Sequence, residues 1–283
     1  EELYRELKDQ GRIVGEYAGG TIGNTLHNYS VLADDSSVAL GTICRNITVG
    51  DYAFKYICST NSHVDMSYLQ PCDGRMARAI CFVTEDGERS FGVGKGIMND
   101  LSPEYVPGKV VQGAAALLIS AYLLRDTTSP MFAATMKAVD CAREAGVPVV
   151  MSMGTANLIR DKREELVAFI LEKVSVLAMN QEEAMVLSGK DDPLLACEAL
   201  LEWADMVLLT VGPRGLYMAS WTEREHARET KDQIHSKSIP EYNKFEYSRG
   251  MRRQECRDGM KIYTHINPYL GGPGAIRNTN GAG

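Results

Sequence analysis

Four short segments of the sequence carry residue types that can hold a sugar, a metal ion or a phosphate. The first segment consists of Gly19, Gly20, Thr21, Ile22, Gly23 and Asn24. Glycines let a backbone approach a ligand closely, and the Asn24 amide offers both a donor and an acceptor to sugar hydroxyls. A tight turn followed by a helix N-cap explains the same residues. For this segment taken alone, the turn is the better explanation.

The second segment is Asn180-Gln181-Glu182-Glu183, directly after the apolar run VSVLAM. If that run is a strand, Asn180 ends it and Glu183 follows on the same side, in the first helical turn. Ligands of open α/β sheets bind at this carboxyl edge, where a carboxylate can hold hydrated Mg²⁺ against phosphates. A helix start with acids favoured by the helix dipole also accounts for the pattern, and by itself accounts for it better.

The third and fourth segments are rich in glycine. Thr210, Gly212 and Gly215 follow the run MVLL, and glycines at this spacing allow a tight turn against a nucleotide. Hairpin turns use the same residues. At the end of the sequence, Gly281, Ala282 and Gly283 could point free N–H groups at one spot, an anion hole for a transferring phosphoryl group. A flexible terminus is the alternative.

Apolar strands that alternate with amphipathic helices must position these segments. The predicted strands cover residues 115–120, 147–151, 174–179 and 206–210. The predicted helices cover residues 131–145, 162–173, 181–187 and 194–203. Continuous apolar strands between helices predict an α/β fold, a doubly wound, mostly parallel sheet with helices on both faces.

The N-terminal third has a different pattern. We predict a short strand at 13–17, helices at 24–33 and 51–60, and a buried strand at 37–43. Residues 78–84 and 88–93 flank a short turn at 85–87, which predicts a β-hairpin. Within it, residues 92–96 (GVGKG) hint at a phosphate loop but lack GK[ST] and a following helix, so we assign them to the end of a strand.

Composition narrows the class of protein. The chain has 283 residues, is 45% hydrophobic and 24% charged, and carries a formal net charge of −7. That charge does not favour a nucleic-acid backbone or an anionic membrane as the main partner. No apolar stretch is long enough to span a membrane, and no two of the seven cysteines are spaced as CxxC. We therefore expect a reduced, cytoplasmic protein; its oligomeric state is left open.

The order of the four segments is more specific than any one of them. Gly-Gly…Asn, Asn-x-x-Glu, Thr-x-Gly-x-x-Gly and Gly-Ala-Gly follow one another as in the ribokinase-like (PfkB) family of sugar and nucleoside kinases, which the chain resembles over nearly its whole length. The stretches AGGTIGNTLHNYSVLADD, SAYLLR, LAMNQEEA, EYNKFEYSRGMR and HINPYLGGPGAIRNTNGAG are most similar to the purine nucleoside kinases of that family.

The resemblance implies one kinase domain over residues 1–283, with a small β lid formed by about 12–18 and 74–98, and a charged surface insertion at about 222–261. It implies transfer of the γ-phosphoryl of ATP, with Mg²⁺, to the ribose 5′-hydroxyl of inosine or guanosine. Gly19 to Asn24 would contact the nucleoside, and Arg125 would face the purine or the product phosphate. Asn180 and Glu183 would organise Mg²⁺ and the phosphates. Thr210, Gly212 and Gly215 would line the ATP site. Gly281 to Gly283 would form the anion hole.

The sequence also departs from the family pattern. The family's catalytic aspartate follows Gly-Ala-Gly, its first strand carries an aspartate that grips the ribose, and neither is present here. An aspartate that many relatives carry after the strand predicted at 147–151 is replaced by Ser152-Met153-Gly154-Thr155. We therefore expect a fragment that is inactive alone. A sugar kinase such as a ribokinase or fructokinase, and a non-catalytic nucleoside-binding relative, are the alternatives.

Overall fold

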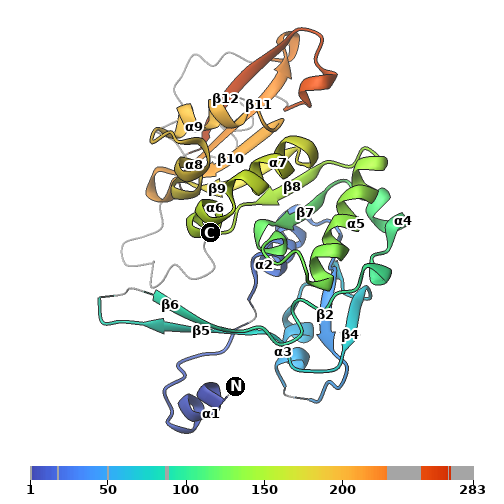
Figure 1. Ribbon diagram of the computed structural model, residues 1–283, viewed down its shortest axis with the longest axis vertical. Coiled ribbons are helices and arrows are strands. Elements are labelled where there is room, and N and C mark those ends of the chain that lie inside the picture. Colours follow the sequence, from blue (N-terminus) through green and yellow to red (C-terminus); the bar gives the residue numbers. More distant parts are fainter. Residues whose placement is uncertain are drawn as a thin grey trace. The chain divides into compact units, whose positions relative to one another are not determined.

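The computed structural model describes residues 2–17, 19–49, 51–86, 89–227, 250–266 and 268 (Figure 1). The chain divides into two compact units. The first comprises Glu1–Pro107 and Asp126–Lys137, and the second comprises Gly108–Arg125 and Ala138–Gly283.

A six-stranded sheet forms the centre of the second unit. Its strands lie in the order β12-β11-β10-β9-β8-β7. Four of them are parallel: β7 (Leu117–Ser120), β8 (Val149–Ser152), β9 (Val176–Asn180) and β10 (Met206–Thr210). Two antiparallel strands extend the sheet, β11 (Leu216–Glu223) and β12 (Gly259–Ile266). The predicted α/β class with a mostly parallel sheet is confirmed.

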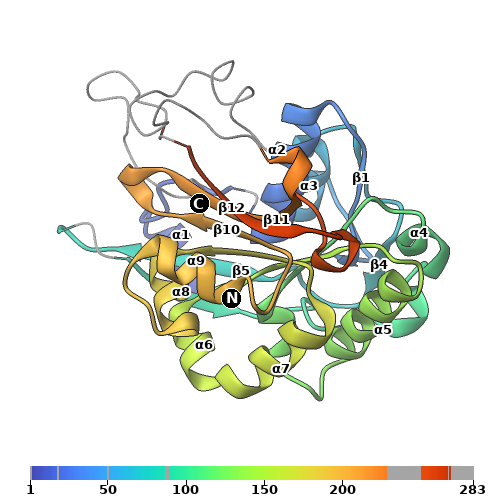
Figure 2. The same cartoon turned by 90° about the horizontal axis from the view of Figure 1, so that it is seen from above.

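Helices pack against this sheet because its strands carry apolar side chains, which the helices shield from water. Met151, Leu177 and Val207 are register neighbours on one face, and all three are fully buried. Figure 2 shows four helices together along one side of the sheet. They are α6 (Ala156–Asp161), α7 (Arg163–Lys173), α8 (Gln181–Ser188) and α9 (Pro193–Leu200). The shorter elements of this unit are α4 (Gly108–Gln112), η2 (Ala121–Leu124), η3 (Gly212–Arg214), η4 (Arg224–His226) and η6 (Arg253–Glu255), and α5 (Pro130–Glu144) crosses the boundary between the units.

The first unit consists of short elements. Its helices are α1 (Glu2–Asp9), α2 (Thr21–Ala33), α3 (Tyr52–Ser59) and the 3-10 turn η1 (Pro103–Tyr105). Its strands form two-stranded sheets. These pair β1 (Ser37–Val38) with β3 (Val64–Asp65), β2 (Gly41–Cys44) with β4 (Leu69–Cys72), and β5 (Arg78–Val83) with β6 (Arg89–Gly94). The predicted hairpin is confirmed as β5–β6.

Two sequence-based expectations are wrong, and a third does not hold at the two ends of its segment. Residues 13–17 form no strand, because Gly15 interrupts the run and Val14 and Tyr17 face solvent with no neighbouring strand among the described residues. The single strand expected at 37–43 is divided into β1 and β2, which pair with different partners. The segment 222–261 is not wholly a surface excursion, since Thr222 lies fully buried in β11 and 259–261 begin β12.

The middle of that segment, residues 228–249, lies outside the described part of the chain. Among the helices that are described, none is long and apolar enough to cross a membrane.

Candidate functional site

Asn180 and Thr210 lie side by side at the carboxyl edge of the parallel sheet. They are the last residues of β9 and β10, and they are direct register partners. Parallel strands bring their carboxyl ends to the same edge, which is where ligands of open α/β sheets bind. The predicted neighbourhood of these two residues is thus confirmed. Gly283, expected at the same edge, lies with Gly281 and Ala282 outside the described residues.

Asn180 and Glu183 form a reciprocal cap at the start of α8. The Asn180 Oδ1 accepts a hydrogen bond from the Glu183 backbone N–H at 2.9 Å. The Glu183 carboxylate in turn accepts from the Asn180 backbone N–H and from its Nδ2, both at 3.0 Å. The helix-start explanation is therefore correct. Glu183 can still bind a ligand while it caps the helix, because each of its carboxylate oxygens has a second lone pair.

Burial sets the chemistry of this carboxylate. Glu183 is only 6% exposed, and burial raises its pKa, partly offset by the hydrogen bond from the Asn180 backbone. A carboxyl group whose pKa is raised on folding costs no stability where both states are protonated; the cost builds up as the pH rises from its ordinary pKa to the raised one and stays constant above it. Two donors from Asn180 partly offset this cost, because they stabilise the ionised form of the carboxylate.

We expect Asn180→Ala to lower the free energy of unfolding by about 1–2 kcal/mol, the usual cost of losing an N-cap. The loss should be larger at pH 7 than near pH 4, because the lost Nδ2 donor stabilises the ionised form of Glu183, whose share grows as the pH rises. Denaturant unfolding at both pH values measures it.

The matched control is Thr155→Ala. Thr155 caps α6 by accepting from the Leu158 N–H at 3.3 Å, and no carboxylate of the described residues is hydrogen-bonded to it, so its loss should not depend on pH in this way. Equal pH dependence of the two variants would contradict the assigned role of Asn180.

The glycine turn after β10 has one glycine required by packing and one with open space. Gly212 and Gly215 both have positive φ, +51° and +90°. A Cβ at Gly215 would lie 2.1 Å from the Ile266 carbonyl oxygen, whereas one at Gly212 would meet no described atom within 4 Å. The backbone at Gly212 can therefore be approached by a ligand. At Gly215, the absence of a side chain allows the backbone of β12 to pack directly against the turn. This turn also joins two antiparallel strands, as the hairpin alternative predicted.

Sequence reasoning missed two contacts that fix this turn. The Arg214 guanidinium donates to Gln181 Oε1 at 2.7 Å, which ties the turn to the first residue of α8. The His265 Nε2 lies 2.6 Å from the Arg214 carbonyl oxygen. The His265 ring also stacks on the Tyr217 ring, with 4.5 Å between the ring centres. Gln181 and Arg214 lie inside the predicted motifs, and this position was the only hint in the sequence that they take part in the site. Nothing in the sequence around His265 indicated its contact with the turn.

Arg125 is placed differently from the expectation. The run LLISAYLLR is not one strand, since β7 ends at Ser120 and η2 follows. Ser120 caps that turn, and Arg125 ends it with its guanidinium 6.0 Å from the centre of the Tyr122 ring. Arg125 thus follows the carboxyl end of β7, and its contact with a purine or phosphate stays a prediction.

The first segment, Gly19 to Asn24, belongs to the other unit. α2 begins at Thr21, so Asn24 lies inside the helix rather than at its cap, and its N–H donates to the Gly20 carbonyl at 3.0 Å. Gly20 has φ +106°, which favours glycine, and a Cβ at Gly19 or Gly20 would have no described neighbour within 4 Å. The two glycines therefore leave open space before the helix, as a ligand contact requires.

Comparison with known proteins gives consistent results. Residues 1–238 match the model of the pfkB family carbohydrate kinases. The chain is 48% identical over 284 residues to the guanosine-inosine kinase of Escherichia coli K12. That alignment covers 100% of this chain and 65% of the relative, so the chain spans slightly less than two thirds of the curated protein's length.

Solved structures agree on the fold. The adenosine kinase of Sinorhizobium meliloti superposes with a TM-score of 0.64 at 24% identity, covering 76% of this chain and 65% of that one. The Anopheles gambiae adenosine kinase in complex with P1,P4-di(adenosine-5) tetraphosphate gives 0.61 at 20% identity, covering 77% and 70%. The match to the family model covers most of this chain. The chain therefore belongs to the pfkB family of carbohydrate kinases.

Proposed function

We propose that this chain is the main part of a purine nucleoside kinase, which transfers the γ-phosphoryl of ATP to the ribose 5′-hydroxyl of inosine or guanosine and yields IMP or GMP. The observation that carries the proposal is the 48% identity, along the whole chain, to a protein named guanosine-inosine kinase. Free thiols at all seven cysteines support the reducing cytoplasm as its compartment.

The edge of the sheet supports phosphoryl transfer. Such a reaction needs alignment and charge stabilisation rather than covalent chemistry from the protein. Asn180 and Thr210 present polar side chains side by side, and the open backbone at Gly212 follows directly. The N-terminus of α8 adds the positive end of a helix dipole. We assign this edge to ATP, with Thr210 and Gly212 lining its site; Gly215, also expected there, would shape the turn, because the Ile266 backbone fills the space beside it.

Mg²⁺ would neutralise charge on the phosphates, and the residues present suit it as an outer ligand. The Glu183 carboxylate keeps two hydrogen bonds to Asn180 and is buried, so it suits water molecules of a hydrated ion better than direct coordination. Mg²⁺ commonly keeps several waters in this way. Among the described residues no group of three His, Cys, Asp or Glu side chains gathers to hold a metal directly.

The other roles follow the family pattern. Gly19 to Asn24 would contact the nucleoside, Arg125 the purine or product phosphate, and Gly281 to Gly283 the transferring phosphoryl group. A sugar kinase is the second candidate, favoured by the family model's description as a carbohydrate kinase.

The test is an assay of the purified intact protein with ATP, Mg²⁺ and one acceptor at a time, namely inosine, guanosine, adenosine, ribose or fructose. Chromatography of the nucleotide products, with ADP release as the second readout, should show IMP and GMP. Phosphorylation of ribose or fructose in preference to nucleosides would assign the second candidate. Nucleoside binding without ADP release would instead indicate a non-catalytic relative.

A further inference from the structure

Arg125 follows the carboxyl end of β7, and its half-buried guanidinium has no hydrogen bond or ion pair with any described residue. Arg214, at the same edge of the sheet, is by contrast paired, since it donates to Gln181 Oε1 at 2.7 Å. A guanidinium that is half-buried without a partner has lost water and gained nothing in exchange. Binding of an anion to Arg125 would recover that cost.

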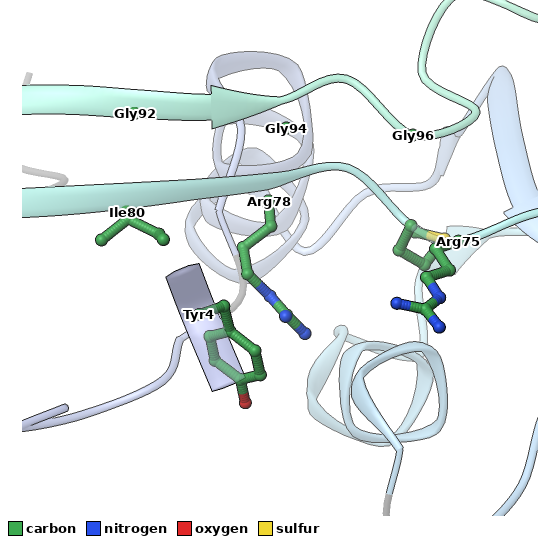
Figure 3. A pocket seen from close by; sticks show the side chains of 8 residues that line it. Tyr4, Arg75, Arg78, Ile80, Gly92, Gly94 and Gly96 are labelled. Atoms are coloured by element: carbon green, nitrogen blue, oxygen red, sulfur yellow. The ribbon is translucent and has the colours of Figure 1, made fainter. Parts of the chain in front are cut away.

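The arginines beside the β5–β6 hairpin differ from Arg125 in this respect. Arg75 and Arg78 line a cavity of about 250 Å³ together with glycines of the GVGKG stretch (Figure 3). Arg78 lies over the Tyr4 ring, with 3.4 Å between its guanidinium carbon and the ring centre. Both arginines have interaction partners of their own. We therefore assign no ligand to this cavity.

The Tyr122 ring, which lies beside Arg125, is fixed by the ends of two neighbouring strands. Ser120, the buried last residue of β7, accepts a hydrogen bond from the Tyr122 N–H at 3.4 Å. The ring packs against Gly154, just after β8, where a Cβ would lie 3.0 Å from the Tyr122 Cε2. Gly154 also has φ +84°, so both its backbone and the ring require glycine there.

The fixed ring restricts where the Arg125 side chain can lie. The Arg125 guanidinium carbon is 6.0 Å from the centre of the Tyr122 ring, at the outer limit of a cation–π contact. The Arg125 backbone N–H donates to the Tyr122 carbonyl oxygen at 3.4 Å, which closes the η2 turn. The ring thus helps to place the guanidinium but leaves its N–H donors to a ligand.

Arg125 and the residues assigned to ATP follow different strands. Asn180 and Thr210 end β9 and β10, whereas Arg125 follows β7, and β8 lies between β7 and β9. With neighbouring strands about 4.8 Å apart, the ends of β7 and β9 are about 10 Å apart. This separation favours a different phosphate from those held at Asn180 and Thr210. In phosphoryl transfer, the other phosphate is the one that the acceptor carries after the reaction.

We propose that Arg125 binds the phosphate of the nucleoside monophosphate product and that Tyr122 is the positioning residue for this contact; the proposal rests on the function proposed above. A phosphate monoester presents pairs of oxygens that a guanidinium binds with two charge-assisted hydrogen bonds. A purine edge offers neutral acceptors only, which leave the charge of Arg125 uncompensated. Because the nucleoside lacks the phosphate, Arg125 holds the product in preference to the substrate.

The main variant is Arg125→Gln, which removes the positive charge and the paired donors. Calorimetric titration of the intact protein gives Kd for IMP, inosine, ATP and inorganic phosphate, and its melting temperature is measured alongside. We expect Kd for IMP to rise about ten- to a hundredfold, as for the loss of hydrogen bonds to a charged group. Kd for inosine and for ATP should not change. The matched control is Arg143→Gln, an exposed arginine that pairs with Glu172 at 3.5 Å, which should change none of these values.

Two substitutions at Tyr122 test its positioning role. Tyr122→Phe keeps the ring and should bind IMP as the wild type does. Tyr122→Leu removes the ring and should raise Kd for IMP about two- to fivefold, without changing Kd for inosine. A merely structural role would not change the ratio of these two constants. In the double variant with Arg125→Gln, loss of the ring should add nothing, because Tyr122 acts through Arg125.

Four outcomes would overturn the inference. Unchanged IMP affinity in Arg125→Gln would remove Arg125 from phosphate binding, and equal losses for inosine and IMP would assign it to the purine. Weaker binding of inorganic phosphate with unchanged IMP affinity would make this a site for free phosphate. Additive losses in the double variant would remove the positioning role of Tyr122. Failure of the proposed function is distinguishable, because the wild-type protein would then not phosphorylate inosine at all.

Discussion

Replacing Glu183 with glutamine is expected to lower kcat about 10–100-fold while changing the nucleoside KM little. Outer partners of a bound metal commonly contribute that much to activity. The amide keeps the size of the side chain but removes the charge that would orient hydrated Mg²⁺ on the phosphates, a role that matters most as charge redistributes during transfer. Steady-state kinetics of the intact protein with inosine, ATP and Mg²⁺ measure the effect.

The adjacent glutamate provides the matched control. Glu182 lies on the same first turn of α8 but is exposed and pairs with Arg160 at 3.3 Å, a surface contact worth at most about 1 kcal/mol. Glu182→Gln should leave kcat unchanged. A rise in nucleoside KM at constant kcat for Glu183→Gln would place Glu183 in the substrate pocket instead. Unfolding curves separate either result from loss of the cap.

The second large effect concerns stability. Gly215→Ala should lower the free energy of unfolding by about 3 kcal/mol, because φ is +90° and the new Cβ would lie 2.1 Å from the Ile266 carbonyl oxygen. Backbone cannot yield as a flexible side chain does, so β12 must shift away from the turn. Urea unfolding followed by circular dichroism checks the value.

Gly189→Ala is the control for backbone strain alone. Gly189 ends α8 with φ +73°, and a Cβ there would have no described neighbour within 4 Å. Its replacement should cost only about 1–2 kcal/mol, the cost of a left-handed residue. Equal losses at both glycines would show that the approach of Ile266 is not the reason for Gly215.

The sequence by itself determined the parallel part of the sheet and the place of its edge residues. Apolar runs of strand length between amphipathic helices are local patterns, and they predicted β7 to β10 to within two residues at each end. A strand's last residue is also local information. Once the strands are parallel, Asn180 and Thr210 must meet at one edge.

The tertiary structure decided what depends on distant residues. β12 became a strand only by pairing with β11 across a segment whose charge suggested a surface excursion. Arg214 reaches Gln181 across 33 positions, and His265 reaches Arg214 across 51. The burial of Glu183 and the need for glycine at 215 have the same origin, since each depends on what packs against the residue. Local periodicity cannot predict such neighbours, because residues far apart in the sequence come together only when the strands pair to form the sheet.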